Sequence, residues 1–436
     1  MKKYFLILLL IASCFQARAI EYPSFSTTLK NGLKVIVCEK PGNDFAFFQV
    51  TYRTGSKDEK PGIRGMAHMF EHMMFRGTEK YPGNSVFDNV RKVGGDCNAS
   101  TSFDRTEYHE YVPVTALEKM MDIEADRMNN LVITQDILNT ERQVVGEELR
   151  NGLSNWYGKM NADRYKLLYP EGHPYEVDVI GFLDQITAFT KEQCQAFYDA
   201  HYAPNNAFIV VVGNVKHEEV FALAEKYFGV ITKQLKLEEN KDIPDVFTSK
   251  VKSNDLPLDF PVQIYSYVIP WPAATDKDYF AIDMLSDILF FDDNSILKNR
   301  LVNKNHQAYG IQSSSDKTAL YPHLEVIDII MNAQMGNVKV KKAIREEIDK
   351  IATDGIDQKI IDNYIRGMEA TNAMSNYSAE GIAVELDNYE YYGHDYNLAY
   401  HAVDNYKKVT PDDLKRVAAT YFSTDRMQVI NVKPIN

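Results

Sequence analysis

The segment from His68 to His72, His-Met-Phe-Glu-His, constrains this chain more than any other stretch. Residues four apart lie on the same face of an α-helix, so a helix here would aim the His68 and His72 imidazoles at one point. Glu71 follows His68 by three residues and leans toward the same point. Imidazole nitrogens are preferred zinc ligands, and a carboxylate beside a bound water can accept its proton. The H-x-x-E-H spacing therefore predicts a zinc site with a general base beside it.

The residues around this motif favour a buried helix. Methionine and phenylalanine occupy most of the other positions between Met66 and Phe75. A helix that is apolar nearly all round is typical of a buried element. The alternative is a polar helix face that carries two unrelated histidines. Buried His and Glu side chains need partners, however, and a metal ion supplies one.

A second acidic helix is expected at residues 139–150. Glu141 and Glu148 are two helical turns apart and lie on one face, whereas Glu147 points about 100° away. About 75 residues separate His72 from Glu148. Zinc hydrolases usually keep three protein ligands and leave one position open for water, so a third ligand is needed. Taken alone, the two glutamates could equally belong to a solvated helix face.

The order and spacing of these residues resemble the insulinase-like (pitrilysin) zinc metallopeptidases. That family combines H-x-x-E-H with a Glu-x6-Glu helix about 75 residues later. The resemblance implies that Glu148 is the third zinc ligand and that Glu141 is a nearby acid supporting catalysis. It also implies one Zn2+ per chain, held by His68, His72 and Glu148, with Glu71 as general base.

Other segments extend the resemblance over nearly the whole mature chain. Residues 94–102 are similar to the family's Gly-Gly-x-x-Asn-Ala-x-Thr segment. In relatives this segment is an edge strand that takes an extended peptide by strand addition, which implies substrate-binding roles for Asn98 and Ala99. Three further segments match in order and spacing: residues 173–175, 202–206 and 212–214.

The chain departs from the family in its second half. Relatives place an Arg and a Tyr, seven residues apart, where they hold the substrate carbonyl. Tyr309 fits the Tyr position and implies a substrate-binding role, but Val302 stands seven residues before it, and Arg300 is out of register. A missing cation would remove a contact that stabilises developing oxyanion charge. Arg300 could substitute, a homologous subunit or a homodimer could supply the pair, or the second half could be fully degenerate.

The beginning of the chain is typical of an export signal. Lys2 and Lys3 precede a short apolar run, and Ala17-Arg18-Ala19 is a small-x-small cleavage site. Residues 1–19 are therefore expected to be a signal peptide, which implies export, to the periplasm if the source is a Gram-negative bacterium. Cys14 leaves lipid anchoring as the second interpretation. No later segment is apolar enough to predict a transmembrane helix, and the net charge of −13 argues against nucleic acid.

Two homologous domains are expected after the signal peptide. The charged, proline-containing segment 233–260 predicts a linker between a zinc-bearing domain at 20–232 and a metal-free domain at 261–436. Residues 190–211 and 410–431 share one pattern, a Thr-capped helix followed by a turn and a strand. The predicted fold class is α+β, with two homologous α/β rolls. Each is a mainly antiparallel sheet packed with helices, and the two face each other around a chamber.

Local patterns also predict individual strands. Asn31-Gly32 lies between two β-rich runs and is typical of a hairpin turn. Phe48, Val50 and Tyr52 alternate with other residues, so they are expected on one buried face of a strand.

Two functions follow from these observations. The first is an exported zinc endopeptidase that cleaves peptides or unfolded segments. The second is a non-catalytic peptide-binding or scaffold subunit, because several relatives have lost the zinc motif. The presence of His68, Glu71, His72 and Glu148 favours catalysis.

Overall fold

The computed structural model describes residues 21–237, 242–246, 253–258, 263–315, 317–331, 337–423 and 428–434. The predicted signal peptide, including Cys14, lies outside the described residues. Among the described helices, none is both long and apolar enough to cross a membrane.

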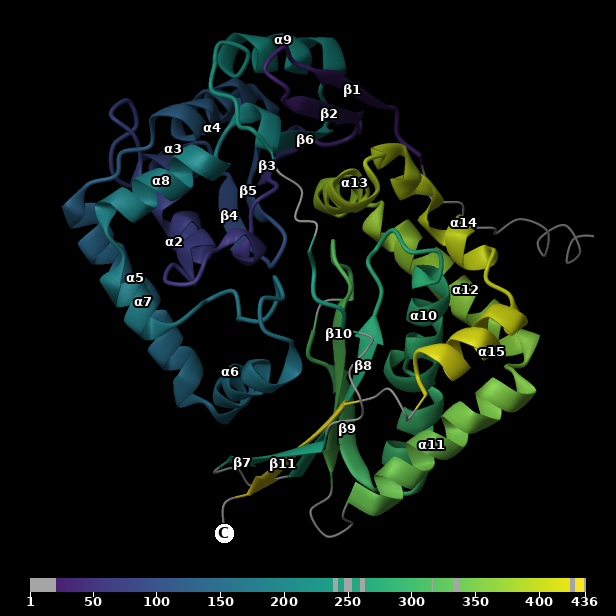
Figure 1. Cartoon of the computed structure of the whole chain (residues 1–436). Helices are drawn as coiled ribbons and strands as arrows, with labels where there is room; N and C mark the ends of the chain where they lie inside the picture. The colour runs from purple at the N-terminus through teal and green to yellow at the C-terminus, as the bar shows by residue number, and fades with distance from the viewer. Residues whose placement is uncertain are drawn as a thin grey trace, which may run out of the picture.

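Two open sheets form the framework, one in each half of the chain (Figure 1). The first sheet has the order β1-β2-β6-β3-β5-β4 and the second has the order β7-β11-β8-β10-β9. The strands of the first are β1 (Ser24–Thr28), β2 (Lys34–Glu39), β3 (Phe45–Tyr52), β4 (Asp96–Thr101), β5 (Thr106–Pro113) and β6 (Ala207–Gly213). Those of the second are β7 (Ser253–Leu258), β8 (Gln263–Trp271), β9 (Ala308–Ser313), β10 (His323–Met331) and β11 (Gln428–Pro434).

The two sheets repeat one topology. Strand β2 pairs with β6 in parallel, and β7 pairs with β11 in parallel. The remaining pairs, β6–β3–β5–β4 and β11–β8–β10–β9, are antiparallel in both sheets. Strands in equivalent positions of the two sheets also occur in the same order along the chain. The predicted duplication and the α+β fold class are therefore confirmed. Strand β1 is an addition that forms the predicted hairpin with β2, and Gly32 has a φ of 89° at its turn.

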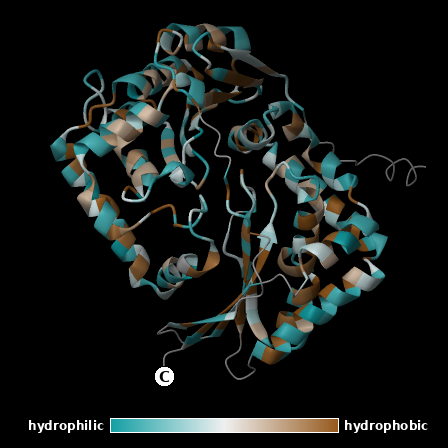
Figure 2. Cartoon of the chain, in the orientation of Figure 1, coloured by the Kyte–Doolittle hydropathy of each residue, from teal (hydrophilic) through white to brown (hydrophobic). Residues whose placement is uncertain are grey.

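Helices pack on both sheets. In the first half they are α2 (Met66–Met73), α3 (Ser85–Lys92), α4 (Leu117–Asn130), α5 (Gln135–Ser154), α6 (Trp156–Leu168), α7 (Leu183–Ala188), α8 (Lys191–His201) and α9 (His217–Tyr227). In the second half they are α10 (Tyr279–Ser286), α11 (Asn337–Asp354), α12 (Gln358–Ser375), α13 (Ala379–Gly393), α14 (Ala402–Lys407) and α15 (Pro411–Thr420). Figure 2 shows apolar and polar residues intermixed around the long helices such as α11, as expected where one face is buried.

The repeated helices α8 and α15 begin in the same way. Thr190 accepts a hydrogen bond from the backbone N–H of Gln193, whose side chain returns to Thr190. Thr410 and Asp413 form the same capping box at α15. Each helix leads into the central strand that pairs in parallel, β6 or β11. The cap pattern in the sequence therefore marks equivalent helices of the two halves.

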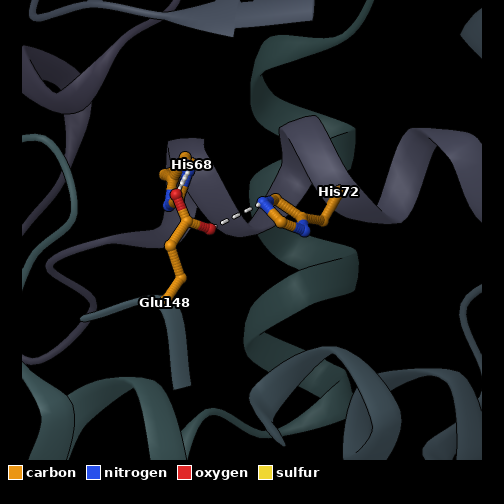
Figure 3. A group of neighbouring side chains, drawn as sticks. All are labelled: His68, His72 and Glu148. Atoms are coloured by element: carbon orange, nitrogen blue, oxygen red, sulfur yellow. Dashed lines mark ion pairs between the residues drawn. The ribbon is translucent and has the colours of Figure 1, made fainter. Parts of the chain in front are cut away.

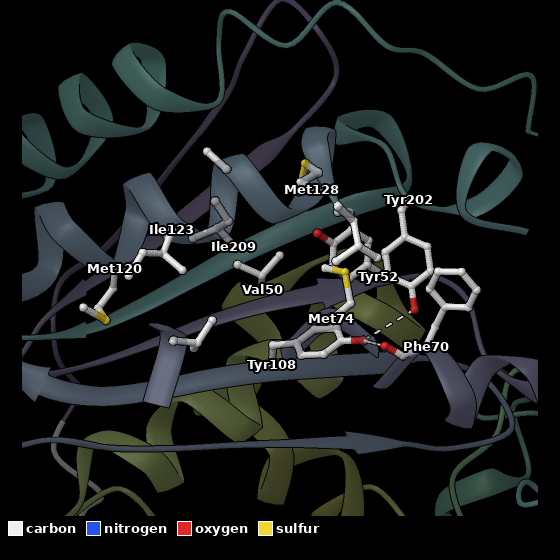
Figure 4. Close-up of a cluster of buried hydrophobic side chains, with 14 of the residues drawn as sticks. Val50, Tyr52, Phe70, Met74, Tyr108, Met120, Ile123, Met128, Tyr202 and Ile209 are labelled. Atoms are coloured by element: carbon white, nitrogen blue, oxygen red, sulfur yellow. Dashed lines mark hydrogen bonds between the residues drawn. The ribbon is translucent and has the colours of Figure 1, made fainter. Parts of the chain in front are cut away.

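The largest core lies between the first sheet and its own helices. It includes Phe48, Val50 and Tyr52 of β3, as predicted from their alternation. In Figure 4 the Tyr108 hydroxyl of β5 donates to the carbonyl oxygen of Phe70 in α2 at 3.3 Å. It also lies 3.5 Å from the Tyr202 hydroxyl, which directly follows α8. The core thus fixes α2 against the sheet.

The opposite face of each sheet is covered by a helix from the other half of the chain. Helix α13 packs on the first sheet, with Ile382, Ala383 and Leu386 against Phe208 and Val210 of β6 and their neighbours. Helix α6 packs on the second sheet in return. Met160 and Leu168 of α6 pack in one apolar cluster with residues of β7, β8, β10 and β11. Each half therefore buries one face with its own helices and one with a borrowed helix.

Arg-Asp ion pairs anchor both borrowed helices. Arg164 of α6 donates from Nη1 to both carboxylate oxygens of Asp328 in β10, at 2.8 Å each, and both side chains are buried. At the other junction, Arg105 Nη1, just before β5, lies 3.1 Å from Asp387 Oδ2 of α13. The Asp387 carboxylate also accepts a hydrogen bond from Gln49 of β3 at 2.9 Å. The halves are joined by matched charge as well as by apolar packing.

Part of the expected linker belongs to the second sheet. Strand β7 lies within residues 233–260 and pairs with β11, so the end of that segment is structured. Alternating polarity was too weak to reveal it, because the strand contains Asn254, Asp255 and Pro257.

We expect Asp328→Asn to destabilise the whole protein. The substitution removes the carboxylate that pairs with the buried Arg164 guanidinium, and breaking a buried ion pair typically costs about 3 kcal/mol or more. Urea unfolding of the mature chain would measure the loss. Asp255→Asn is the control, because Asp255 pairs with Lys433 on the surface, and it should cause no measurable change. Equal midpoints for the two variants would contradict this account of the junction.

Candidate functional site

The start of helix α2 is fixed by a distant carboxylate. Glu59 accepts hydrogen bonds from the backbone N–H groups of Gly65 and Ala67, both at 2.8 Å. Gly65 has a φ of 94°, and a Cβ there would lie 2.6 Å from the carbonyl oxygen of Ile180. Glycine is therefore required at this turn. Glu59 is buried and caps the helix in place of a neighbouring Ser or Thr, which is why its role left no local signal in the sequence.

Helix α2 separates its apolar and functional faces. Met66, Met69, Phe70 and Met73 are buried in the core, as the sequence predicts. The side chains between them, at positions 68, 71 and 72, are only partly buried. The two histidines approach α5, and Glu71 approaches β4. The helix is therefore held by its apolar face, and its His and Glu side chains keep an accessible side.

Glu148 of α5 meets both histidines (Figure 3). Its Oε1 lies 3.8 Å from His68 Nε2, and its Oε2 lies 3.4 Å from His72 Nε2. One ligand atom from each of the three residues lies within 4.8 Å of the others. Two imidazoles and one carboxylate that converge in this way fit a tetrahedral Zn2+ with one position left for water. The structure thus brings together the three predicted metal ligands.

Glu141 supports the other side of His72. Its carboxylate is fully buried, and its Oε2 lies 3.6 Å from His72 Nδ1. Its Oε1 accepts a hydrogen bond from Arg76 Nε at 2.6 Å. A carboxylate beside the nitrogen that does not face the metal orients a ligating imidazole and raises its basicity. Glu141 therefore positions His72 and does not itself join the convergent ligand group.

The two histidines have different electrostatic surroundings. Burial, with a smaller contribution from His72, lowers the pKa of His68 to about 4, so this imidazole is neutral and able to bind a metal. Burial also acts to lower the pKa of His72, but the carboxylates of Glu141, Glu148 and Glu71 outweigh it and raise that pKa. In addition, Nδ1 of His68 is buried and has no hydrogen-bond partner among the residues that the structure describes. The site is therefore rich in negative charge that a cation would balance.

Glu71 is held by the neighbouring edge strand. Thr101 of β4 donates a hydrogen bond from its hydroxyl to Glu71 Oε2 at 2.6 Å. Burial raises the pKa of Glu71 above its ordinary value, although the Thr101 hydrogen bond opposes the shift. A carboxylate with a raised pKa is better suited to accept and return a proton near neutral pH. Thr101 stands in the 94–102 segment, but only the structure shows that it touches Glu71.

Strand β4 has a free edge beside this carboxylate. It is the last strand of the first sheet and pairs only with β5 among the described strands. Asn98 is exposed and Ala99 is half-buried, in a pattern that alternates along the whole strand. The unpaired backbone groups of an edge strand can bind an extended peptide. Asn98 and Ala99, two of the predicted substrate-binding residues, therefore lie on the edge strand whose Thr101 contacts Glu71.

Among the described residues, neither Tyr309 nor Arg300 makes a hydrogen bond or ion pair with the proposed zinc-site residues. Tyr309 lies on β9, the edge strand of the second sheet that is equivalent to β4, and it is 65% exposed. Arg300 donates to Glu347 Oε1 at 2.6 Å and also pairs with Glu346, both on α11. Val302 packs against the apolar core of its own domain. Arg300 is thus paired with carboxylates of its own domain. This pairing does not support the interpretation that Arg300 substitutes for the missing family Arg.

Asp104 joins the site to the second half. It is buried in the turn between β4 and β5, where Oδ1 accepts a hydrogen bond from the Tyr175 hydroxyl at 2.6 Å. Its Oδ2 accepts from the backbone N–H of Leu320 at 2.9 Å and from the Tyr392 hydroxyl of α13 at 3.2 Å. The turn that ends β4 is therefore held by both halves. Because its partners are distant in sequence, the motif around Asp104 did not reveal this role.

A second His-carboxylate group lies on the surface near α9. It consists of Glu39, His217 and Glu218. Glu39 is already paired with Lys216 at 3.0 Å and accepts the backbone N–H of His217 at 3.0 Å. These contacts account for the group as a surface ion pair that caps a helix.

Sequence comparisons match both halves of the chain to one peptidase family. The family model described as "Insulinase (Peptidase family M16)" matches residues 34–169. The model described as "Peptidase M16 inactive domain" matches residues 188–368. The first match contains His68, His72 and Glu148, and the second contains Val302 and Tyr309.

Individual relatives agree with the family models. The protein named zinc protease PqqE of Helicobacter pylori is 29% identical over 434 residues, which cover 94% of this chain and 92% of that protein. The crystal structure of a protease from Helicobacter pylori superposes with a TM-score of 0.86 at 28% identity, covering 95% of this chain and 100% of the other. The mitochondrial-processing peptidase subunit beta of Caenorhabditis elegans is 27% identical over 63% of this chain and 59% of its own length.

We expect Glu59→Ala to weaken the support of α2. The change removes the acceptor of two buried backbone N–H groups, and losing such a cap should lower the free energy of unfolding by about 2 kcal/mol. Chemical denaturation of the mature chain is the measurement. Glu79→Ala serves as a control, because Glu79 is exposed and close in sequence. A Glu59 variant as stable as the control would show that α2 does not depend on this carboxylate.

Proposed function

Because the chain belongs to the insulinase family, peptidase family M16, we propose that it is a zinc-dependent endopeptidase. The observation that carries this proposal is the convergence of His68, His72 and Glu148, with the Glu71 carboxylate beside them. The matching relatives include proteins named zinc proteases, which supports the same conclusion. The substrates would be peptides or unfolded protein segments.

The residues in this site divide the work of hydrolysis. His68, His72 and Glu148 would hold one Zn2+. When bound, zinc supplies a Lewis acid and lowers the pKa of a water molecule toward neutrality. Glu71 would take a proton from the attacking water and deliver it to the leaving amine. Since Thr101 occupies Oε2 of Glu71, the proton would be carried on Oε1.

The edge of β4 would bind the substrate backbone. A peptide that adds to this edge as a further strand would run past Glu71, because Thr101 of the same strand touches that carboxylate. Such binding needs an extended backbone with free hydrogen-bonding groups. Folded proteins do not offer one, so the site favours unfolded segments.

The proposed place of action is outside the cytoplasm. The pattern of residues 1–19 supports export, to the periplasm of a Gram-negative bacterium, with cleavage after Ala19. Lipid attachment at Cys14 is the alternative. Unfolded peptides in such a compartment would be the natural substrate class.

A partner subunit would complete the active site. Val302 replaces the family Arg, and Arg300 is paired with two glutamates of α11. A homodimer would not supply the missing cation, because each copy carries Val302. We therefore propose a homologous second subunit that carries an Arg and a Tyr seven residues apart. The name of the Caenorhabditis elegans relative describes that protein as a subunit.

The competing function is a non-catalytic peptide-binding subunit. The match of residues 188–368 to an inactive domain is the observation that favours it. The complete set of zinc-site side chains in the first half favours catalysis instead. Metal content and turnover separate the two.

We predict about one zinc per mature chain by elemental analysis. His68→Ala and His72→Ala should lose it, whereas the exposed control His401→Ala should keep it. Full metal content in both histidine variants would exclude this site.

Glu71→Gln should retain zinc but lose turnover by about a hundredfold or more, because it removes the proton carrier and leaves the ligands intact. Wild-type turnover by Glu71→Gln would exclude Glu71 as the base.

We also predict that Arg300→Ala leaves the peptidase activity of the isolated chain nearly unchanged, because Arg300 is held by α11. Adding a homologous exported subunit that lacks H-x-x-E-H but has the Arg-Tyr pair should raise kcat by about a hundredfold. Peptide-cleavage assays with and without that subunit would test this. A large loss in Arg300→Ala, together with no response to the subunit, would overturn the two-subunit proposal.

A further inference from the structure

A separate cavity lies within the second half, among α10, α12, α13 and α14, whose positions Figure 1 shows. Its volume is about 610 Å³. Small-molecule sites in proteins typically have volumes of about 300–1,000 Å³. None of the proposed zinc-site residues lines this cavity, so it requires an explanation of its own.

Aromatic side chains form much of the cavity wall. They are contributed by α10, α13 and α14 and comprise Tyr279, Phe280, Tyr389, Tyr392 and Tyr406. Aromatic faces carry partial negative charge and attract either apolar groups or organic cations. The wall therefore suits a ligand with an apolar or aromatic body.

Two of the carboxylates in the wall already have partners within the protein. Lys317 Nζ lies 3.0 Å from Asp283 Oδ1 and also pairs with Asp287. The Tyr406 hydroxyl donates to Asp283 Oδ2 at 2.6 Å, and the Tyr364 hydroxyl donates to Asp287 Oδ2 at 2.9 Å. This cluster holds the surrounding helices together and needs no ligand.

Glu385 of α13 is different. Its side chain is partly buried in the cavity wall, and no hydrogen bond or ion pair joins it to any residue that the structure describes. Burial is the one influence that shifts its pKa, which is raised. A partly desolvated carboxylate without a partner is unfavourable, and a cation beside it would relieve the cost.

We propose that this cavity binds an organic cation, an ammonium or guanidinium group on a short aromatic or apolar body. The cationic group pairs with Glu385, and the body packs against the tyrosine wall. The charged lining residues are Asp276, Asp283, Asp287 and Glu385 against Lys317 alone, which excludes phosphates and carboxylates as ligands. The cation could be a free amine or the basic side chain of a peptide, and the two share this chemistry. The proposal does not depend on zinc or on peptidase activity.

Titration calorimetry on the full mature chain tests the proposal with phenethylamine as the probe and 2-phenylethanol as its neutral counterpart. Phenethylamine should bind more tightly than the alcohol. Glu385→Gln should weaken phenethylamine binding by about tenfold or more, because it removes a charged hydrogen-bond partner. Glu380→Gln removes the same charge from an exposed position of the same helix, outside the cavity, and should leave the affinity unchanged.

A second variant keeps the test independent of Glu385. Thr371 is exposed at the cavity wall, so Thr371→Trp should obstruct the cavity without disturbing the core, and should also weaken phenethylamine binding. A short acetylated, amidated peptide with one central lysine is the second probe. Binding of either cation supports the proposal, and the tighter one identifies the source. Equal affinity for amine and alcohol, or an amine affinity that neither variant reduces, would overturn it.

Discussion

The exchange of helices between the two halves is the constraint on which the structure depends. Each sheet has two apolar faces, and its own half covers only one of them. Helix α13 covers the other face of the first sheet, and α6 covers the other face of the second. At each junction an Arg-Asp pair lies among the apolar contacts. The Arg164–Asp328 pair is fully buried, and removing either partner of such a pair is strongly destabilising. The halves therefore form one structural unit although they arose as two copies of one topology.

The zinc-site geometry is linked to this exchange. Helix α5 carries Glu141 and Glu148, and it leads directly into α6, which is bound to the second sheet. The turn after β4 is held by Asp104, whose partners include Tyr392 of α13. Both Glu148 and the strand beside Glu71 are thus braced by the second half of the chain. This support gives the second half a structural role that does not depend on any catalytic residue of its own.

The sequence predicted the features that rest on short-range periodicity. His68, Glu71 and His72 share a helix face because of their spacing, and Glu148 follows from helical geometry once the family pattern is included. The alternation of residues that face the core in β3 and the Thr caps of α8 and α15 were also predicted from the sequence. Glu59, Thr101 and Asp104 were not assigned their contacts, because each acts on residues far along the chain or on another element. For the same reason the pairing of Arg300 with α11 could only be found in the structure. Strand β7 was missed for a different reason, because its Asn254, Asp255 and Pro257 weaken the strand pattern.

The borrowed helices also have a consequence for the order of folding. Strand β2 pairs with β6, so Lys34 lies beside Phe208, which is distant in sequence. The outer face of β6 is covered only by α13, which comes much later in the chain. The first half therefore cannot cover both faces of its sheet until α13 has been made. Contacts of such long sequence separation slow folding, so that aggregation-prone intermediates with exposed apolar surface persist for longer. Complete folding of the zinc-site half therefore depends on a helix that is made about 170 residues after the last strand of its own sheet.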